Sequence, residues 1–120
     1  MKDWAKQLFT IIDRKDAEGF SLFFTADAIF RFANAPAVSG KENIRKAVQD
    51  FFVAIKGLRH RVTGVWEFEN IVVCEGEVTY TRLDDKIITV PFVDIFRMQD
   101  GLIADYRIYI DIAPLFTLGN

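Results

Sequence analysis

The sequence predicts a single α+β domain over residues 1–120, in which a strongly curved antiparallel sheet wraps around three N-terminal helices and an apolar internal pocket. Two patterns carry this prediction. Apolar residues recur with helical spacing in the first half of the chain and alternate with polar residues, as in strands, in the second half. The hydrophobic fraction of 51%, with 12 Phe among 120 residues, is sufficient for one buried core.

The first two helices are short. Over residues 3–14, apolar side chains recur at i, i+4, i+7 and i+8, which places them on one helical stripe. The Asp16 side chain can cap a second helix. This second helix is expected to carry three aromatic residues, Phe20, Phe23 and Phe24.

The third helix has the clearest signals. Ser39 and Glu42 have the spacing of a capping box, in which each side chain satisfies a free backbone N–H. Gly57 is expected to stop the helix. Residues 28–34, between the second and third helices, predict a short strand. The buried stripe of the third helix is predicted to consist of Ile44, Ala47, Val48, Phe51, Phe52 and Ile55.

Four long strands follow, over residues 58–69, 71–84, 86–99 and 102–111, and tight turns join them into an antiparallel meander. Because side chains alternate between the two faces of a strand, parity assigns each residue a side. The even-numbered residues are the more apolar set in every strand, so we expect the even face to pack against the helices.

Turn chemistry predicts the register of the meander. Residues 99–101 resemble a three-residue hairpin loop, with Gly101 taking the positive φ of a bulge, which pairs Met98 with Leu102. The same counting through the other turns predicts four neighbouring pairs: Asp94 with Tyr106, Gly76 with Asp94, Gly64 with Gly76, and His60 with Tyr80.

Asp94 is the candidate functional residue of this sheet. It is the one acid among the apolar even positions of its strand, and the predicted register gives it two glycine neighbours and therefore a hollow. Burial raises the pKa of a carboxyl group, which would make Asp94 a proton donor or acceptor near neutral pH. The alternative is a structural role, with the carboxyl hydrogen-bonded to Tyr106 or to a helix N–H.

Composition argues against several classes of protein. Lys and Arg number 15 against 17 Asp and Glu, without the basic patch that nucleic-acid binding requires. No apolar run is long enough to span a membrane, and the first residues lack a secretory signal. A lone cysteine, Cys74, is consistent with the cytoplasm. One His and dispersed acids suggest neither a metal site nor a bound cofactor.

The order of these elements resembles the nuclear transport factor 2-like superfamily, which includes ketosteroid isomerases, limonene-epoxide hydrolases and SnoaL-like polyketide cyclases. The resemblance covers nearly the whole chain. It implies a cone-shaped sheet with a deep internal pocket, and homodimers that form through the outer sheet face. The apolar residues expected on that outer face are Ile71, Val73, Ile87, Val93, Ile95 and Ile103.

Residues 93–97, Val-Asp-Ile-Phe-Arg, resemble the ketosteroid isomerase strand that carries the oxyanion-hole Asp, with Asp94 at that position. That enzyme family is a known example of an Asp kept protonated by an apolar site. Two other catalytic groups of these isomerases are replaced here. The general base falls at Phe32, and the tyrosine of the first helix falls near Leu8.

Residues 32–36, Phe-Ala-Asn-Ala-Pro, resemble the epoxide hydrolase segment whose Tyr and Asn hold the attacking water. Asn34 is retained in it, and Phe32 replaces the Tyr. Arg82 and Asp84 resemble the Arg-x-Asp of these hydrolases, in which the Asp is the acid. Their water-activating Asp is replaced by Ile108.

Two hypotheses follow. The first is a cofactor-free isomerase, cyclase, dehydratase or epoxide hydrolase acting on a small apolar substrate, with Asp94, His60 and Tyr106 as catalytic residues. The second is a non-catalytic ligand-binding or dimerisation module. Asp84, paired with Arg82, is a possible second acid. The residues expected to bind the substrate are Asn34, Phe32, Trp66, Tyr80, Phe92 and Ile108.

Overall fold

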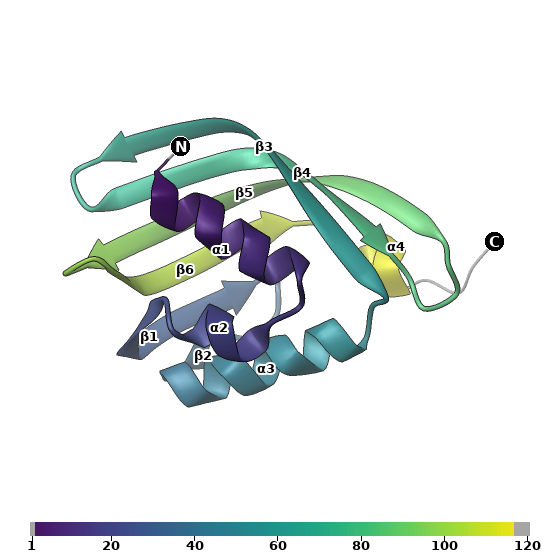
Figure 1. The fold of residues 1–120 in the computed structure, drawn as a ribbon, viewed down its shortest axis with the longest axis horizontal. Helices are drawn as coiled ribbons and strands as arrows, with labels where there is room; N and C mark the ends of the chain where they lie inside the picture. The colour runs from purple at the N-terminus through teal and green to yellow at the C-terminus, as the bar shows by residue number, and fades with distance from the viewer. Residues whose placement is uncertain (1, 117–120) are drawn as a thin grey trace.

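The computed structural model describes residues 2–116 and has the predicted α+β architecture, a curved sheet with helices on one side (Figure 1). The helices are α1 (Asp3–Asp13), α2 (Ala17–Ser21), α3 (Lys41–Val53) and α4 (Ala113–Phe116). The strands are β1 (Phe24–Phe32), β2 (Val38–Ser39), β3 (Gly57–Phe68), β4 (Ile71–Thr81), β5 (Ile87–Gln99) and β6 (Leu102–Ile110).

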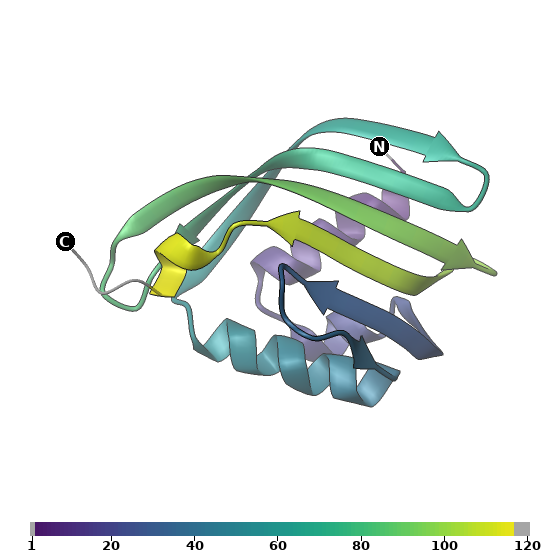
Figure 2. The same ribbon diagram turned by 180° about the vertical axis from the view of Figure 1, so that it is seen from behind.

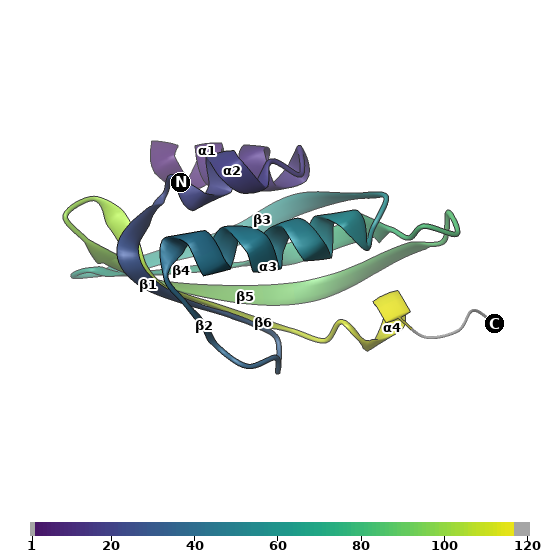
Figure 3. The same cartoon turned by 90° about the horizontal axis from the view of Figure 1, so that it is seen from below.

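The six strands form one sheet in the order β2-β1-β6-β5-β4-β3, with β2 and β3 at its two edges, so it is not closed into a barrel. The predicted meander β3–β6 is antiparallel throughout. The sheet as a whole is mixed, because β1 runs parallel to β6. Parallel neighbours need a long crossover connection, and here α3 and three strands of the meander supply it. Helices α1, α2 and α3 lie on the same side of the sheet (Figure 3).

The helices form where their apolar periodicity predicts, and they bury that face. Leu8 and Ile12 of α1 and Ile44 and Val48 of α3 are all buried. The Asp16 side chain accepts a hydrogen bond of 2.9 Å from the backbone N–H of Gly19, which confirms the predicted cap of α2. The second helix ends earlier than predicted, and its third aromatic residue belongs to β1.

The predicted capping box of α3 is wrong. Ser39 pairs with Ile29 as part of β2, so its backbone is committed to the sheet. Gly40, with φ of 92°, occupies the N-cap position, and no side chain caps the helix. The Asn43 side chain instead donates to the Ser39 carbonyl.

The turn between β5 and β6 is shorter than predicted. Gln99 pairs with Leu102, which leaves a two-residue turn, and Asp100 and Gly101 both have positive φ. This combination is the type I′ geometry, whose twist matches that of the flanking strands. Gly101 therefore has the predicted positive φ, but Met98 does not pair with Leu102.

The predicted bulge lies inside β6 instead, where Ala104 is the extra residue. It turns Ile103 into the core, at 0% exposure, although parity placed that residue on the outer face. The two changes together bring Asp94 opposite Ile108 rather than Tyr106. The predicted register was therefore wrong by two residues, while the buried face of β5 was predicted correctly.

The glycine pairs shift in the same way, so no glycine lies opposite Asp94. A Cβ atom on Gly76 would lie 2.1 Å from the carbonyl oxygen of Arg61, which shows that the backbone of β3 already fills this space. The predicted glycine hollow beside Asp94 is thus absent. The observed partners are Cys74 for Asp94, Phe92 and Val62 for Gly76, Glu75 for Gly64, and Val78 for His60.

A second bulge, with Thr63 as the extra residue, lies in β3 between Val62 and Gly64. An extra residue reverses the parity of everything beyond it. Val65 consequently turns towards the core, and Trp66 turns outward with 55% of its surface exposed.

Candidate functional site

A cavity of about 180 Å³ lies between the helices and the sheet, and its walls come from α1, α2, α3 and all six strands. The residues that form it are almost all aliphatic or aromatic. Among the described residues, those that line it include no Lys, Arg, Asp or Glu; the polar ones are His60, Tyr80 and Tyr106. The six expected site residues that line the cavity are Phe32, His60, Tyr80, Phe92, Tyr106 and Ile108.

Other expected site residues lie elsewhere. Trp66 is on the outer face because of the β3 bulge, which corrects its predicted place in the pocket. Asn34 is exposed in the turn after β1, and its neighbours Ala35 and Pro36 contribute to the cavity wall instead.

Arg82 and Asp84 form an ion pair in the β4–β5 hairpin, outside the cavity. The Arg82 Nη1 atom also donates a hydrogen bond of 2.9 Å to the Pro114 carbonyl, so this side chain holds α4 against the hairpin.

His60 is bound tightly by an acid that the sequence did not single out. Its Nδ1 atom lies 2.6 Å from Oδ1 of Asp13, and its backbone N–H donates to Oδ2 of the same carboxyl group at 3.0 Å. The imidazole packs between Phe9 and Phe92, with ring centroids 5.1 and 5.3 Å away. No described residue hydrogen-bonds Nε2, so this nitrogen is available to a molecule in the cavity.

Asp94 lies behind the cavity wall rather than in it. The side chain is buried, at 1% exposure, and Tyr106 donates a hydrogen bond of 2.9 Å to its Oδ2 atom. No described residue hydrogen-bonds Oδ1. Burial raises the pKa of the Asp94 carboxyl to about 8, and the hydrogen bond from Tyr106 opposes that rise. Asp94 is consequently neutral at pH 7.

The hydroxyl and thiol groups near Asp94 are neutral too. Burial, followed by the proximity of Asp94, raises the pKa of the Cys74 thiol to about 12. The same two causes raise the pKa of Tyr80 and the pKa of Tyr106. These groups can therefore donate hydrogen bonds but do not ionise near neutral pH.

The sequence profile of the SnoaL-like domain matches residues 5–106. The chain belongs to the SnoaL-like domain family. A search of curated protein sequences finds no match.

Solved structures share the fold of this SnoaL-like domain at low identity. A Catenulispora acidiphila protein with a ketosteroid isomerase-like fold, in complex with trimethylamine, aligns with a TM-score of 0.88 at 14% identity, over 96% of this chain and 90% of its own. A putative SnoaL-like polyketide cyclase from Jannaschia aligns with a TM-score of 0.76 at 18% identity, over 92% of this chain and 87% of its own. A putative isomerase from Bacillus subtilis aligns with a TM-score of 0.77 at 19% identity, over 89% of this chain and 83% of its own.

The cavity of the SnoaL-like domain is thus lined by one imidazole, two tyrosines and otherwise apolar side chains. Periodicity could not reveal that Asp13 would join His60, because they are far apart in the sequence. One local signal existed: Asp13 is an acid in the last turn of α1, where the helix dipole disfavours negative charge. An unfavourable charge at that position suggests that the carboxylate has a specific partner.

Proposed function

We propose that this SnoaL-like domain is a cofactor-free acid/base enzyme that moves a proton on a small, largely apolar substrate, as an isomerase, cyclase or dehydratase does. The observation that carries the proposal is the Asp13–His60 pair. A charged and hydrogen-bonded group at the wall of an apolar cavity costs stability unless it is used or fully satisfied. Here one side of the imidazole is satisfied by Asp13, and the other remains available to a ligand.

The hydrogen bond fixes the role of each ring nitrogen. A carboxylate accepts but cannot donate, so Nδ1 carries the proton that faces Asp13, and in the neutral imidazole Nε2 then carries the lone pair. Nε2 of His60 would remove a proton from carbon or oxygen of the substrate, and Asp13 would stabilise the imidazolium that forms. Asp13 therefore acts as a positioning residue.

Tyr106 and Asp94 would serve the other half of the reaction. Removal of a proton next to a carbonyl group places negative charge on its oxygen, and a preorganised donor stabilises that charge. Tyr106 lines the cavity and is backed by the neutral Asp94 carboxyl group. Asp94 would supply the acidic proton through Tyr106, because it does not line the cavity itself.

The fold neighbours support a reaction of this general type, since they include a putative polyketide cyclase and a putative isomerase. An epoxide hydrolase reaction finds less support. Asn34, Arg82 and Asp84, which carry the resemblance to those enzymes, all lie outside the cavity lining.

Proton exchange tests the proposal without knowledge of the natural substrate. Deuterium incorporation from heavy water into small ketones, including acetophenone, can be followed by NMR. We expect catalysed exchange by the native protein and a loss of about 100-fold or more in His60→Gln, the range of general-base contributions. Asp13→Asn should lower the rate as well. Asp50→Asn, an exposed acid on α3, is the matched control and should leave it unchanged.

The result that would contradict the proposal is exchange that is equally fast in His60→Gln. Binding of these ketones without exchange of any of them would instead support the ligand-binding module.

We further propose that the protein is a cytoplasmic homodimer that forms through the outer sheet face. In Figure 2 the strands of the meander lie in front of α1, which is on their far side. Trp66, Val73 and Ile95 are adjacent on the outer face of three neighbouring strands, and Tyr109 lies beside Val93 on the next. Trp66 and Tyr109 are each 55% exposed, so aromatic surface is available for a partner. No helix within residues 2–116 is long and apolar enough to cross a membrane.

A further inference from the structure

We infer that the cavity takes an uncharged molecule built on one aromatic ring, and that steroids and fused-ring polyketides are too large for it. The inference deepens the proposed function, because it names the class of molecule on which that site would act. It rests on the proposed function for turnover, whereas its own test is binding. Three properties of the cavity carry it: its volume, its aromatic walls and its lack of charge.

The volume of the cavity limits a ligand to one ring. Folded proteins leave few voids larger than a water molecule, so a cavity of about 180 Å³ is an unusual feature. An apolar cavity of about 150 Å³ in another protein binds benzene, whereas sites for drug-sized molecules have volumes of roughly 300–1,000 Å³. The cavity therefore has room for one ring with a small substituent, but not for a second fused ring.

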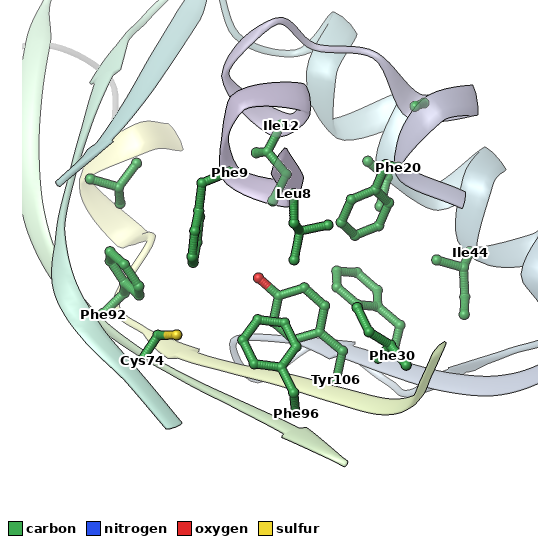
Figure 4. Close-up of a cluster of buried hydrophobic side chains, with 14 of the residues drawn as sticks. Leu8, Phe9, Ile12, Phe20, Phe30, Ile44, Cys74, Phe92, Phe96 and Tyr106 are labelled. Atoms are coloured by element: carbon green, nitrogen blue, oxygen red, sulfur yellow. The ribbon is translucent and has the colours of Figure 1, made fainter. Parts of the chain in front are cut away.

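Aromatic rings bound this volume on its buried side and on the side that reaches the surface. On the buried side, Phe20 from α2 and Phe30 from β1 point towards one another, with ring centroids 5.8 Å apart (Figure 4). On the other side, Phe51 of α3 is half-buried. Its ring centroid lies 4.7 Å from that of Phe32 and 5.9 Å from that of Tyr80. A larger ligand has to break one of these ring contacts.

The same walls favour an aromatic ligand over an aliphatic one. The planes of Phe32 and Phe51 meet at 73°, and those of Phe51 and Tyr80 at 83°, so the rings pack edge to face. This packing sets the positive edge of one ring against the negative face of the next. A flat aromatic ligand can continue the pattern, whereas a puckered aliphatic ring is thicker and has no such charge distribution.

The polar groups around the cavity disfavour a charged ligand. Among the described residues, none that lines it is Lys, Arg, Asp or Glu, so an ion would lose its hydration without meeting an opposite charge. The Asp13 carboxylate lies behind His60 and is already bound to the ring Nδ1 at 2.6 Å and to the backbone N–H at 3.0 Å. Nε2 of His60 can bond to one uncharged polar substituent.

A pair of ketones tests the limit on size. 2-Acetonaphthone is acetophenone with a second fused ring. Their dissociation constants would be measured by NMR, with the ring signals of His60, the only histidine, reporting entry into the cavity. An unspecific apolar surface binds the larger ketone more tightly, because more apolar area is buried. We expect the reverse order, with acetophenone tighter by about tenfold or more, because a second ring overpacks the cavity.

Ligands matched to acetophenone in size test the other two properties. Cyclohexyl methyl ketone replaces the flat ring by a puckered one and should bind several-fold more weakly, because the contacts between aromatic rings are lost. Benzoate and benzylammonium carry charges of opposite sign. Both should bind about a hundredfold more weakly than acetophenone, because neither charge finds a partner in the cavity.

Three variants show whether the walls of the cavity set the limit. Phe51→Ala removes a ring from the wall and should let 2-acetonaphthone bind about tenfold more tightly than it binds the native protein. Ala47→Leu, on the same helix, fills part of the cavity and should weaken acetophenone to a similar extent, which keeps the test open if Phe51→Ala does not fold. Phe68→Ala is the matched control. It removes a ring that is 72% exposed on β3, outside the cavity lining, and should leave both affinities unchanged.

The inference is overturned if the native protein binds 2-acetonaphthone, cyclohexyl methyl ketone or either ion as tightly as acetophenone. Failure of acetophenone to enter the cavity, or an unchanged affinity for it in Ala47→Leu, overturns it as well. The proposed enzymatic function fails separately. Acetophenone that binds with the expected selectivity but shows no catalysed exchange would contradict that function and support this inference.

Discussion

Among single residues, Asp94 has the most unusual environment. Its carboxyl group is buried, with Cys74 and Ile108 as its neighbours across the strands, and accepts one hydrogen bond, from Tyr106. Desolvation of the charge outweighs this hydrogen bond, so the group keeps its proton well above the usual range for Asp. A buried neutral acid of this kind reduces stability most when it is forced to ionise.

This residue predicts a specific dependence of stability on pH. Between about pH 4 and about pH 8 the unfolded chain has lost the Asp94 proton and the folded chain has kept it, so a rise in pH favours unfolding across this window. Asp94→Asn lacks this effect. Urea unfolding should therefore give similar free energies of unfolding for the native protein and the Asn variant near pH 4. Near pH 9 the free energy of unfolding of the Asn variant should be higher by a few kcal/mol, to order of magnitude. A constant difference between the two proteins across this range would refute the raised pKa.

Among the elements, α1 and β3 position the His60 imidazole together. Asp13 ends α1 and binds both the backbone and the ring of His60, and Lys15 just beyond it donates to the Ile55 carbonyl before β3 begins. The short helix is thus tied at its end to the strand that carries the imidazole. The bulge at Thr63 follows His60 in β3 and lets this strand bend over α1.

The same bend explains Gly76. Its position opposite the bulge brings the Arg61 carbonyl so close that a Cβ atom would overlap it, whereas a Cβ at Gly57, where β3 begins, would meet nothing within 4 Å. We expect Gly76→Ala to lower the free energy of unfolding by about 1–3 kcal/mol, the usual effect of overpacking. Gly57→Ala should be nearly neutral. Thermal unfolding compares the two, and equal stabilities would mean that the backbones are not forced together at Gly76.

For the whole molecule, the curved sheet creates two different surfaces. Its concave face, covered by the helices, encloses the cavity and nearly all of the core. Its outer face presents apolar side chains from β3, β4, β5 and β6 among charged ones. A stable dimer buries on the order of 800 Å² per partner, and a sheet face of four long strands provides an area of that order.

Assembly through this face predicts a clear effect of one substitution. Ile95→Lys places a charge at the centre of the outer face, next to Val73, and should shift the protein from dimer to monomer in sedimentation experiments. Leu83→Lys is the control, because Leu83 is equally apolar but lies in the β4–β5 hairpin, 66% exposed, and should leave the dimer intact. A native protein that sediments as a monomer would rule this assembly out.

The sequence by itself determined the type and order of the main elements, the faces of β4 and β5 that are buried, and the burial of Asp94. These properties depend on local periodicity, which each segment carries independently of its neighbours. The family resemblance was also visible in this order of elements and is confirmed by the profile match.

The tertiary structure alone decided the register, the outward turn of Trp66 and the partnership of Asp13 with His60. Register depends on single extra residues, and Thr63 and Ala104 carry no local sign that they are bulged. Contacts between a helix end and a distant strand depend on how the whole sheet bends. For this reason the sequence placed Asp94 on the buried face of the sheet, but only the fold shows that Asp94 is bonded to Tyr106 and lies outside the cavity lining.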